Sequence, residues 1–109
     1  MKRPSSLKRR KQAGAWLREL RETAGLTQLE LAQRLGMKYY AFVSQVETGF
    51  SRLPTAKLEA WALALEVDPT AFAKRLMFFY DPELYRLLDL DSEGVASPDT
   101  GARSATRTA

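Results

Sequence analysis

The sequence predicts an all-α fold. Along most of the 109-residue chain, large apolar residues recur at intervals of three and four, the spacing that places side chains on one face of a helix. Glycines end three of these segments, and Asp-Pro pairs precede two others. Glycine just after a helix and proline at its first position are common helix boundaries. Several short helices, separated by brief turns, are therefore expected.

Length and composition limit the function. A chain of this length forms one domain with a modest core. It contains no cysteine and no histidine, which excludes disulfides, the usual zinc sites and histidine-based acid–base catalysis. Its acidic residues are scattered or cap helices, so a metal-dependent hydrolase is not expected. Nor does any apolar run approach the roughly 18 residues that cross a bilayer. We expect a cytoplasmic protein that is not an enzyme, uses no cofactor and does not bind membranes.

Positive charge is concentrated in the first half of the chain. Residues 1–57 hold twelve basic and four acidic side chains, whereas residues 58–109 hold five basic and nine acidic ones. A basic surface is what binding to a polyanion requires, because each lysine or arginine near a phosphate releases condensed counterions. The alternative is a chance distribution that serves solubility.

The first segment, residues 1–12, is expected to be a basic flexible arm, because six basic side chains accompany Pro4 and two serines. Phosphate contacts by Lys8, Arg9, Arg10 and Lys11 are one interpretation of this arm, and a disordered solubilising tail is the other. Helix one is predicted from Ala15 to Ala24, with an inward stripe formed by Leu17, Leu20 and Ala24.

Two short helices joined by a turn follow between Thr27 and Gly49. Thr27 and Glu30 match a capping box, in which each side chain binds the other residue's backbone N–H, so helix two is expected to start at Gln28. Its inward residues are Leu31, Ala32 and Leu35, and Gly36 ends it. In helix three, Val43 and Val46 are expected to face inward. Its opposite face is small and polar and lacks the Glu/Lys pairs of a merely solvated helix, which suggests a surface that is covered by a partner.

These residues resemble the helix-turn-helix of the lambda repressor and Cro family, also called the XRE type. The similarity covers roughly Ala13 to Phe72, and its marks are Leu17, Leu20, Arg21, Gly25-Leu26-Thr27-Gln28, Leu31-Ala32, Leu35-Gly36, Ser44, Val46-Glu47, Gly49, Pro54, Leu58, Trp61-Ala62, Leu65 and Val67. The resemblance implies a five-helix domain over residues 13–75 that binds double-stranded DNA. This chain carries an extra residue between Gly36 and Glu47, which affects the register of the base-contacting positions.

The resemblance also implies a set of site residues. The helix around Tyr40–Thr48 would enter the major groove, with Tyr40, Ala41, Ser44, Gln45 and Thr48 along its reading edge. Tyr39 and Tyr40 would lie near the groove, although either ring could instead pack against helix two. Gln28, Lys38 and Arg52 are the expected phosphate contacts. An ion pair between Arg21 and Glu47 would tie helix one to the end of the recognition helix.

The second half of the chain continues the helical pattern. Helix four is expected to start near Thr55, whose hydroxyl can cap it, with Leu58, Trp61, Ala62 and Leu65 inward. Asp68-Pro69 is expected to start helix five, which carries Phe72, Leu76 and Phe79. Asp81-Pro82 then restarts an additional C-terminal helix within an extension that covers residues 76–91. Residues 92–109 have the composition of a disordered tail.

The C-terminal extension is more apolar than an exposed helix end. It can fold back on the core or pair with the same segment of another chain. For pairing, the candidate interface residues are Phe78, Phe79, Tyr80, Leu84, Tyr85 and Leu88. The sequence thus predicts a DNA-binding transcriptional regulator, specifically a homodimeric repressor. The alternative is an antitoxin-type protein that binds a partner toxin and its own operator.

Overall fold

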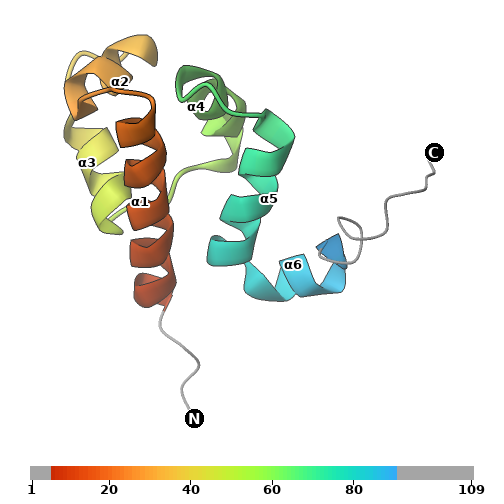
Figure 1. Cartoon of the computed structure of the whole chain (residues 1–109). Coiled ribbons are helices and arrows are strands. Elements are labelled where there is room, and N and C mark those ends of the chain that lie inside the picture. Colours follow the sequence, from red (N-terminus) through yellow and green to blue (C-terminus); the bar gives the residue numbers. More distant parts are fainter. Residues whose placement is uncertain (1–5, 91–109) are drawn as a thin grey trace.

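The computed structural model describes residues 6–90, and all regular structure in this range is helical (Figure 1). The all-α prediction, with an additional C-terminal helix, is therefore confirmed. The elements are α1 (Ser6–Thr23), α2 (Gln28–Arg34), α3 (Ala41–Thr48), the short 3₁₀ helix η1 (Thr55–Lys57), α4 (Leu58–Ala64), α5 (Pro69–Tyr80) and α6 (Pro82–Leu87). The tail predicted at residues 92–109 lies outside the described range. None of the described helices has the length and apolar character needed to cross a membrane.

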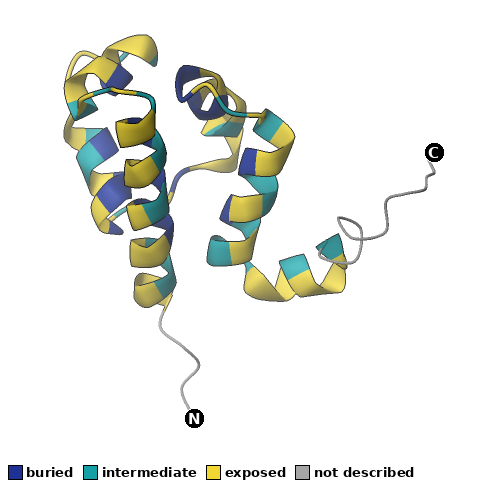
Figure 2. Ribbon diagram, viewed as in Figure 1, coloured by how far each residue is buried: buried dark blue, intermediate teal, exposed yellow. Residues whose placement is uncertain are grey.

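Helix α1 is the centre of the arrangement, since it packs against both α3 and α5 (Figure 1). Helix α2 packs on α3, α4 packs on α5, and α6 extends from the end of α5. The buried faces of helices α1 to α5 meet in one core (Figure 2), which consists of Ala13, Leu17, Leu31, Ala32, Val43, Val46, Leu53, Trp61, Ala62, Ala64, Leu65, Phe72 and Leu76. The inward stripes predicted for each helix supply most of this core.

Local signals set several helix boundaries. The capping box is present, because the Thr27 hydroxyl accepts from the Glu30 N–H at 3.0 Å and the Glu30 carboxylate accepts from the Thr27 N–H at 2.8 Å. Asp68 caps α5 through the Ala71 N–H, with Pro69 at the first helical position. The expected Thr55 cap is wrong. Residues Thr55–Lys57 instead form the 3₁₀ turn η1, in which the Lys57 N–H binds the Pro54 carbonyl, and α4 begins at Leu58 without a side-chain cap.

Helix α1 begins at Ser6, not at Ala15, so residues 6–12 of the predicted arm are helical. Arginine, lysine, glutamine and leucine are good helix formers, and long-range contacts hold the segment in place. Arg9 donates from Nε to the Phe79 carbonyl at 2.7 Å and from Nη2 to the Phe78 carbonyl at 2.6 Å. Arg10 donates from Nε to the Gly49 carbonyl at 2.9 Å. The two arginines therefore bind the carboxyl ends of α5 and α3.

The C-terminal extension is divided between the core and the surface. Helix α5 runs through the domain boundary predicted after residue 75, and Leu76 is buried in the core. Phe79 and Tyr80 also pack against the core, where the Phe79 ring lies 6.0 Å from the Trp16 ring. The leucines of α6 and the turn after it remain exposed, with exposed fractions of 46% for Leu84, 64% for Leu87 and 52% for Leu88.

Candidate nucleic-acid interface

Helix α3 presents a small polar surface. Its inner face is buried through Val43 and Val46, while Ala41, Gln45 and Thr48 are exposed and Ser44 is half-buried. The Thr48 hydroxyl donates to the Gln45 backbone carbonyl at 3.2 Å, so it is held close to its own helix. The side chains expected to read bases thus share one accessible side of α3. A helix with this profile can enter a groove without moving any bulky group.

The turn before α3 carries two exposed tyrosines. Gly36 has a φ of +76°, which ends α2, and the Met37 N–H bonds to the Ala32 carbonyl at 2.8 Å. Tyr39 is 71% exposed and Tyr40, at the N-cap position of α3, is 53% exposed. The Lys38 ammonium lies 6.0 Å from the centre of the Tyr39 ring. Both rings are therefore accessible beside the start of the helix rather than part of the core.

A buried ion pair fixes the carboxyl end of α3. Arg21 and Glu47 are each 8% exposed, and the guanidinium binds both carboxylate oxygens, with Nε–Oε2 at 2.6 Å and Nη2–Oε1 at 3.1 Å. Arg21 also donates from Nη1 to the Leu26 carbonyl at 2.7 Å. The hydrogen bond from Glu47 raises the pKa of Arg21 against the opposing effect of burial. The pair implied by the family resemblance is thus present, and it links α1, the α1–α2 turn and α3.

Gln28 joins this buried pair. Its Nε2 donates to Glu47 Oε1 at 3.0 Å from the first position of α2. The family resemblance implies a phosphate contact for Gln28, and in the structure its amide group donates to the Glu47 carboxylate. A buried carboxylate that accepts several hydrogen bonds is held in one orientation. Gln28 therefore connects α2 to α3.

The loop after α3 is tied to the end of α5. Arg52 binds the Asp81 carboxylate through Nη1–Oδ1 at 3.2 Å and Nη2–Oδ2 at 2.5 Å, and its guanidinium lies 4.7 Å from the centre of the Tyr80 ring. The Leu53 N–H donates to the Tyr80 hydroxyl oxygen at 3.0 Å. Arg52, the expected phosphate contact, is thus half exposed and paired with Asp81. Sequence reasoning did not detect this link, because no local pattern joins residues so far apart in the chain.

Ser51 in the same loop orients Gln45. Its hydroxyl donates to Gln45 Oε1 at 3.3 Å, and its backbone N–H donates to the Gln45 carbonyl at 3.0 Å. Sequence reasoning missed Ser51 and also missed the exposed Phe50 beside it. An amide whose oxygen is already hydrogen-bonded has a defined orientation, which is the requirement for bidentate contact with a base.

Two glycines allow α1 to approach α3 closely. A Cβ built on Gly14 would lie 2.2 Å from the Glu47 carbonyl oxygen, and one on Gly49 would lie 2.8 Å from the backbone nitrogen of Lys11. Gly49 also ends α3 with a φ of +85°. Sequence reasoning identified Gly49 as a helix stop but missed Gly14, although a glycine inside a helical pattern is itself a signal of close packing.

The acidic side chains of the described residues are dispersed over the structure. Between residues 6 and 90, no three acidic side chains come close enough together to hold a metal ion. Most of the acidic side chains described above are engaged as helix caps or as partners of arginines. Helix α3 is thus held in place by a buried ion pair, with polar and aromatic groups exposed around it.

Comparison with protein families gives one result. A family model described as a helix-turn-helix domain matches residues 12–74, which is more than half of the chain. This range covers α2 and α3 completely and includes most of α1 and the first half of α5. A comparison with curated proteins finds no match.

Proposed function

Because the chain belongs to the helix-turn-helix family, whose members are DNA-binding regulators, we propose that it is a sequence-specific regulator of transcription that places α3 in the major groove. The observation that carries this proposal is that α3 combines an accessible polar face with a fixed carboxyl end. Its outer face is small, polar and accessible, while its carboxyl end is fixed by the buried Arg21–Glu47 pair. A helix that must read base edges needs such a face, held rigidly.

Base reading is assigned to the outer face of α3. Gln45 is the principal reader, because a glutamine amide can bind adenine N6 and N7 together, a contact that discriminates by about 1–3 kcal/mol. Tyr40, Ala41, Ser44 and Thr48 complete the reading edge, and Tyr39 lies beside its start. Ala41 and the tyrosine rings offer apolar contact to thymine methyl groups.

Phosphate binding is assigned to residues on either side of α3. Lys38 is exposed before α3 and Arg52 lies after it. Arg52 would exchange the Asp81 carboxylate for a phosphate when DNA binds. The Gln28 amide would bind phosphate through its second N–H, since the first N–H donates to Glu47. Contacts of this kind set register and give affinity without sequence preference.

The regulator is further proposed to be a cytoplasmic homodimeric repressor. One small domain reads only about half of a typical site, and paired domains reach two major grooves about 34 Å apart. A dimer bound across a promoter would exclude the transcription machinery. A second candidate is suggested by the exposed leucines of α6, because an antitoxin-type protein would use such a surface to bind a toxin. Purification separates the two: a simple regulator should be obtained alone, and an antitoxin should copurify with a second protein in stoichiometric amount.

The proposed function is tested by selecting bound duplexes from a random pool. The full-length protein should enrich one palindromic sequence, and the Gln45→Ala variant should enrich a pool that is degenerate at one position of each half-site. Leu63→Ala, which changes an exposed residue of α4, serves as the control and should enrich the wild-type sequence. If the wild-type protein enriches no sequence at low salt, sequence-specific binding is excluded.

A further inference from the structure

Phe50 exposes a large aromatic ring from a fixed backbone. It follows the C-cap residue of α3 and is 74% exposed, the highest value among the large apolar side chains of residues 6–90. The backbone is held on both sides of it. The Gly49 carbonyl accepts from Arg10 Nε at 2.9 Å, and the Ser51 N–H donates to the Gln45 carbonyl at 3.0 Å. The ring is therefore carried at a defined position.

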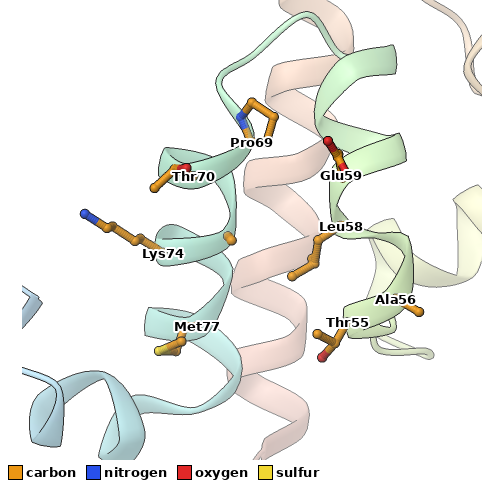
Figure 3. A pocket seen from close by; sticks show the side chains of 9 residues that line it. Thr55, Ala56, Leu58, Glu59, Pro69, Thr70, Lys74 and Met77 are labelled. Atoms are coloured by element: carbon orange, nitrogen blue, oxygen red, sulfur yellow. The ribbon is translucent and has the colours of Figure 1, made fainter.

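The described chain gives this ring no aromatic or cationic partner. Phe50 makes no ring or cation contact within residues 6–90. Two surface hollows, of about 510 and about 290 Å³, are lined by other residues. Figure 3 shows the larger one between α5 and the start of α4, and Figure 1 shows α5 on the side of α1 away from α3. An apolar surface that covers the ring would have to come from a binding partner.

Phe50 also lies beside the proposed base reader. Its neighbour Ser51 donates from its hydroxyl to Gln45 Oε1 at 3.3 Å, so the loop reaches the amide that is assigned to adenine. The basic side chains of Lys38 before α3 and of Arg52 after it make a polyanion the expected partner. In the major groove of DNA, the apolar group is the 5-methyl of thymine, and phenylalanine is among the side chains that contact it.

We infer that the Phe50 ring contacts the methyl group of a thymine near the base that Gln45 reads. The inference rests on the proposed function and adds to it a specificity-determining residue that lies outside α3. The fixed backbone on both sides of Phe50 limits the entropy that is lost when the ring is immobilised against DNA. Because the ring carries no charge, it discriminates between bases without contributing to the salt dependence of binding.

Replacing thymine with deoxyuridine removes only the methyl group and so tests this contact directly. Each thymine in one half-site of the duplex enriched from the random pool is replaced in turn, and fluorescence anisotropy gives the dissociation constant of the full-length protein. For the wild type, at least one replacement should weaken binding by about fourfold, the equivalent of about 0.8 kcal/mol for one buried methyl-sized group. Phe50→Ala should bind the thymine and deoxyuridine forms of that duplex equally, because the contact is already lost.

Two further variants keep the test specific. Leu63→Ala removes another exposed apolar side chain, on α4, and should respond to deoxyuridine as the wild type does. Phe50→Leu keeps an apolar group at the same position and should retain part of the preference for thymine. The melting temperature of Phe50→Ala and the slope of its log affinity against log salt should both be unchanged, since the ring is exposed in the fold and neutralises no phosphate.

Several results would overturn the inference. Phe50→Ala could show the wild-type response to every deoxyuridine replacement, or it could bind all of these duplexes more weakly by one common factor, which would place the ring against deoxyribose. A changed sedimentation of the free protein in Phe50→Ala would show that the ring is covered by protein instead. Failure of the proposed function is seen separately, because the wild type would then enrich no duplex, and both proposals would fail. An enriched duplex in which no thymine replacement depends on Phe50 contradicts the Phe50 contact alone.

Discussion

Arg52 and Asp81 form a bidentate ion pair that joins the loop after α3 to the residue between α5 and α6. Both side chains are roughly 40% exposed, and an exposed pair contributes at most about 1 kcal/mol to stability. In the proposed complex with DNA, the guanidinium would exchange this carboxylate for a phosphate at little cost. Asp81 would then compete with DNA for Arg52.

This competition gives the first prediction. Asp81→Asn removes the competing charge, so affinity for every duplex should rise, by up to about fivefold, the equivalent of 1 kcal/mol. Arg52→Ala should weaken binding to all sequences and reduce the slope of log affinity against log salt by about 0.9. Fluorescence anisotropy over a salt series measures both effects. A changed sequence preference with an unchanged slope would contradict the phosphate role of Arg52.

The Ser51–Gln45 hydrogen bond predicts that loop residue 51 affects base discrimination. Ser51→Ala frees the Gln45 amide to rotate, so discrimination at the base that Gln45 reads should fall by about 1 kcal/mol, within the range for such contacts. Binding to nonspecific DNA should not change. Competition assays with single-base variants of the selected site provide the measurement. Equal losses for specific and nonspecific DNA would show that Ser51 acts on the fold or on phosphate instead.

The close approach at Gly14 predicts a large effect on stability. Gly14→Ala inserts a methyl group where the Glu47 carbonyl oxygen lies, so α3 must move away from α1. Alanine favours a helix by about 1 kcal/mol over glycine, yet overpacking against backbone typically costs about 1–3 kcal/mol. We therefore expect a net destabilisation of up to about 2 kcal/mol. Urea denaturation measures this change in the free energy of unfolding. The exposed Ala15→Ser in the same helix is the control, and a stabilised Gly14→Ala would contradict the described packing.

Arg9 is predicted to act on stability rather than on DNA affinity. It binds the last carbonyls of α5, where a positive charge also interacts favourably with the helix dipole. Arg9→Ala should lower the free energy of unfolding by about 1–2 kcal/mol, whereas the exposed Gln12→Ala should change it little. Thermal denaturation compares the two. If Arg9→Ala lowers the salt slope of DNA binding without affecting melting, the residue contacts phosphate.

The partly buried phenol of Tyr80 predicts a dependence of stability on alkaline pH. Burial raises the pKa of Tyr80, with the Leu53 hydrogen bond acting in the opposite direction. A raised pKa means that the folded state holds the proton more tightly, so this contribution to stability is complete below about pH 10 and is lost as pH rises through the folded pKa. The free energy of unfolding should fall more steeply above pH 10 in the wild type than in Tyr80→Phe. If the free energy of unfolding falls equally with pH in the wild type and in Tyr80→Phe, the proposed contribution of Tyr80 is contradicted.

Features decided by neighbouring residues could be predicted from the sequence. The capping box of Thr27 and Glu30 and the start of α5 at Asp68-Pro69 depend on residues within one helical turn. The burial of Val43, Val46 and Trp61 follows from periodicity along single helices. These local signals were sufficient to give the helical order and the inward faces.

Features that depend on residues far apart in the chain could not be predicted from the sequence. The start of α1 at Ser6 depends on bonds from Arg9 and Arg10 to carbonyls at the far ends of other helices. Charge counting assigned both arginines to a flexible arm, because composition does not reveal an internal acceptor. The same holds for Arg52, whose carboxylate partner lies 29 positions further along the chain, and for Gln28, whose partner Glu47 lies on the next helix.

The bonds of Arg9 also have a consequence for the order of folding. They join residues 69 and 70 positions apart, which is most of the described chain. Closing so long a loop costs more conformational entropy than forming the helix pairs between adjacent elements, so this contact is expected to form late. Interactions that are absent from the transition state govern how fast a protein unfolds. The Arg9 hydrogen bonds are therefore expected to slow unfolding. They form only after both ends of the domain have reached their final positions.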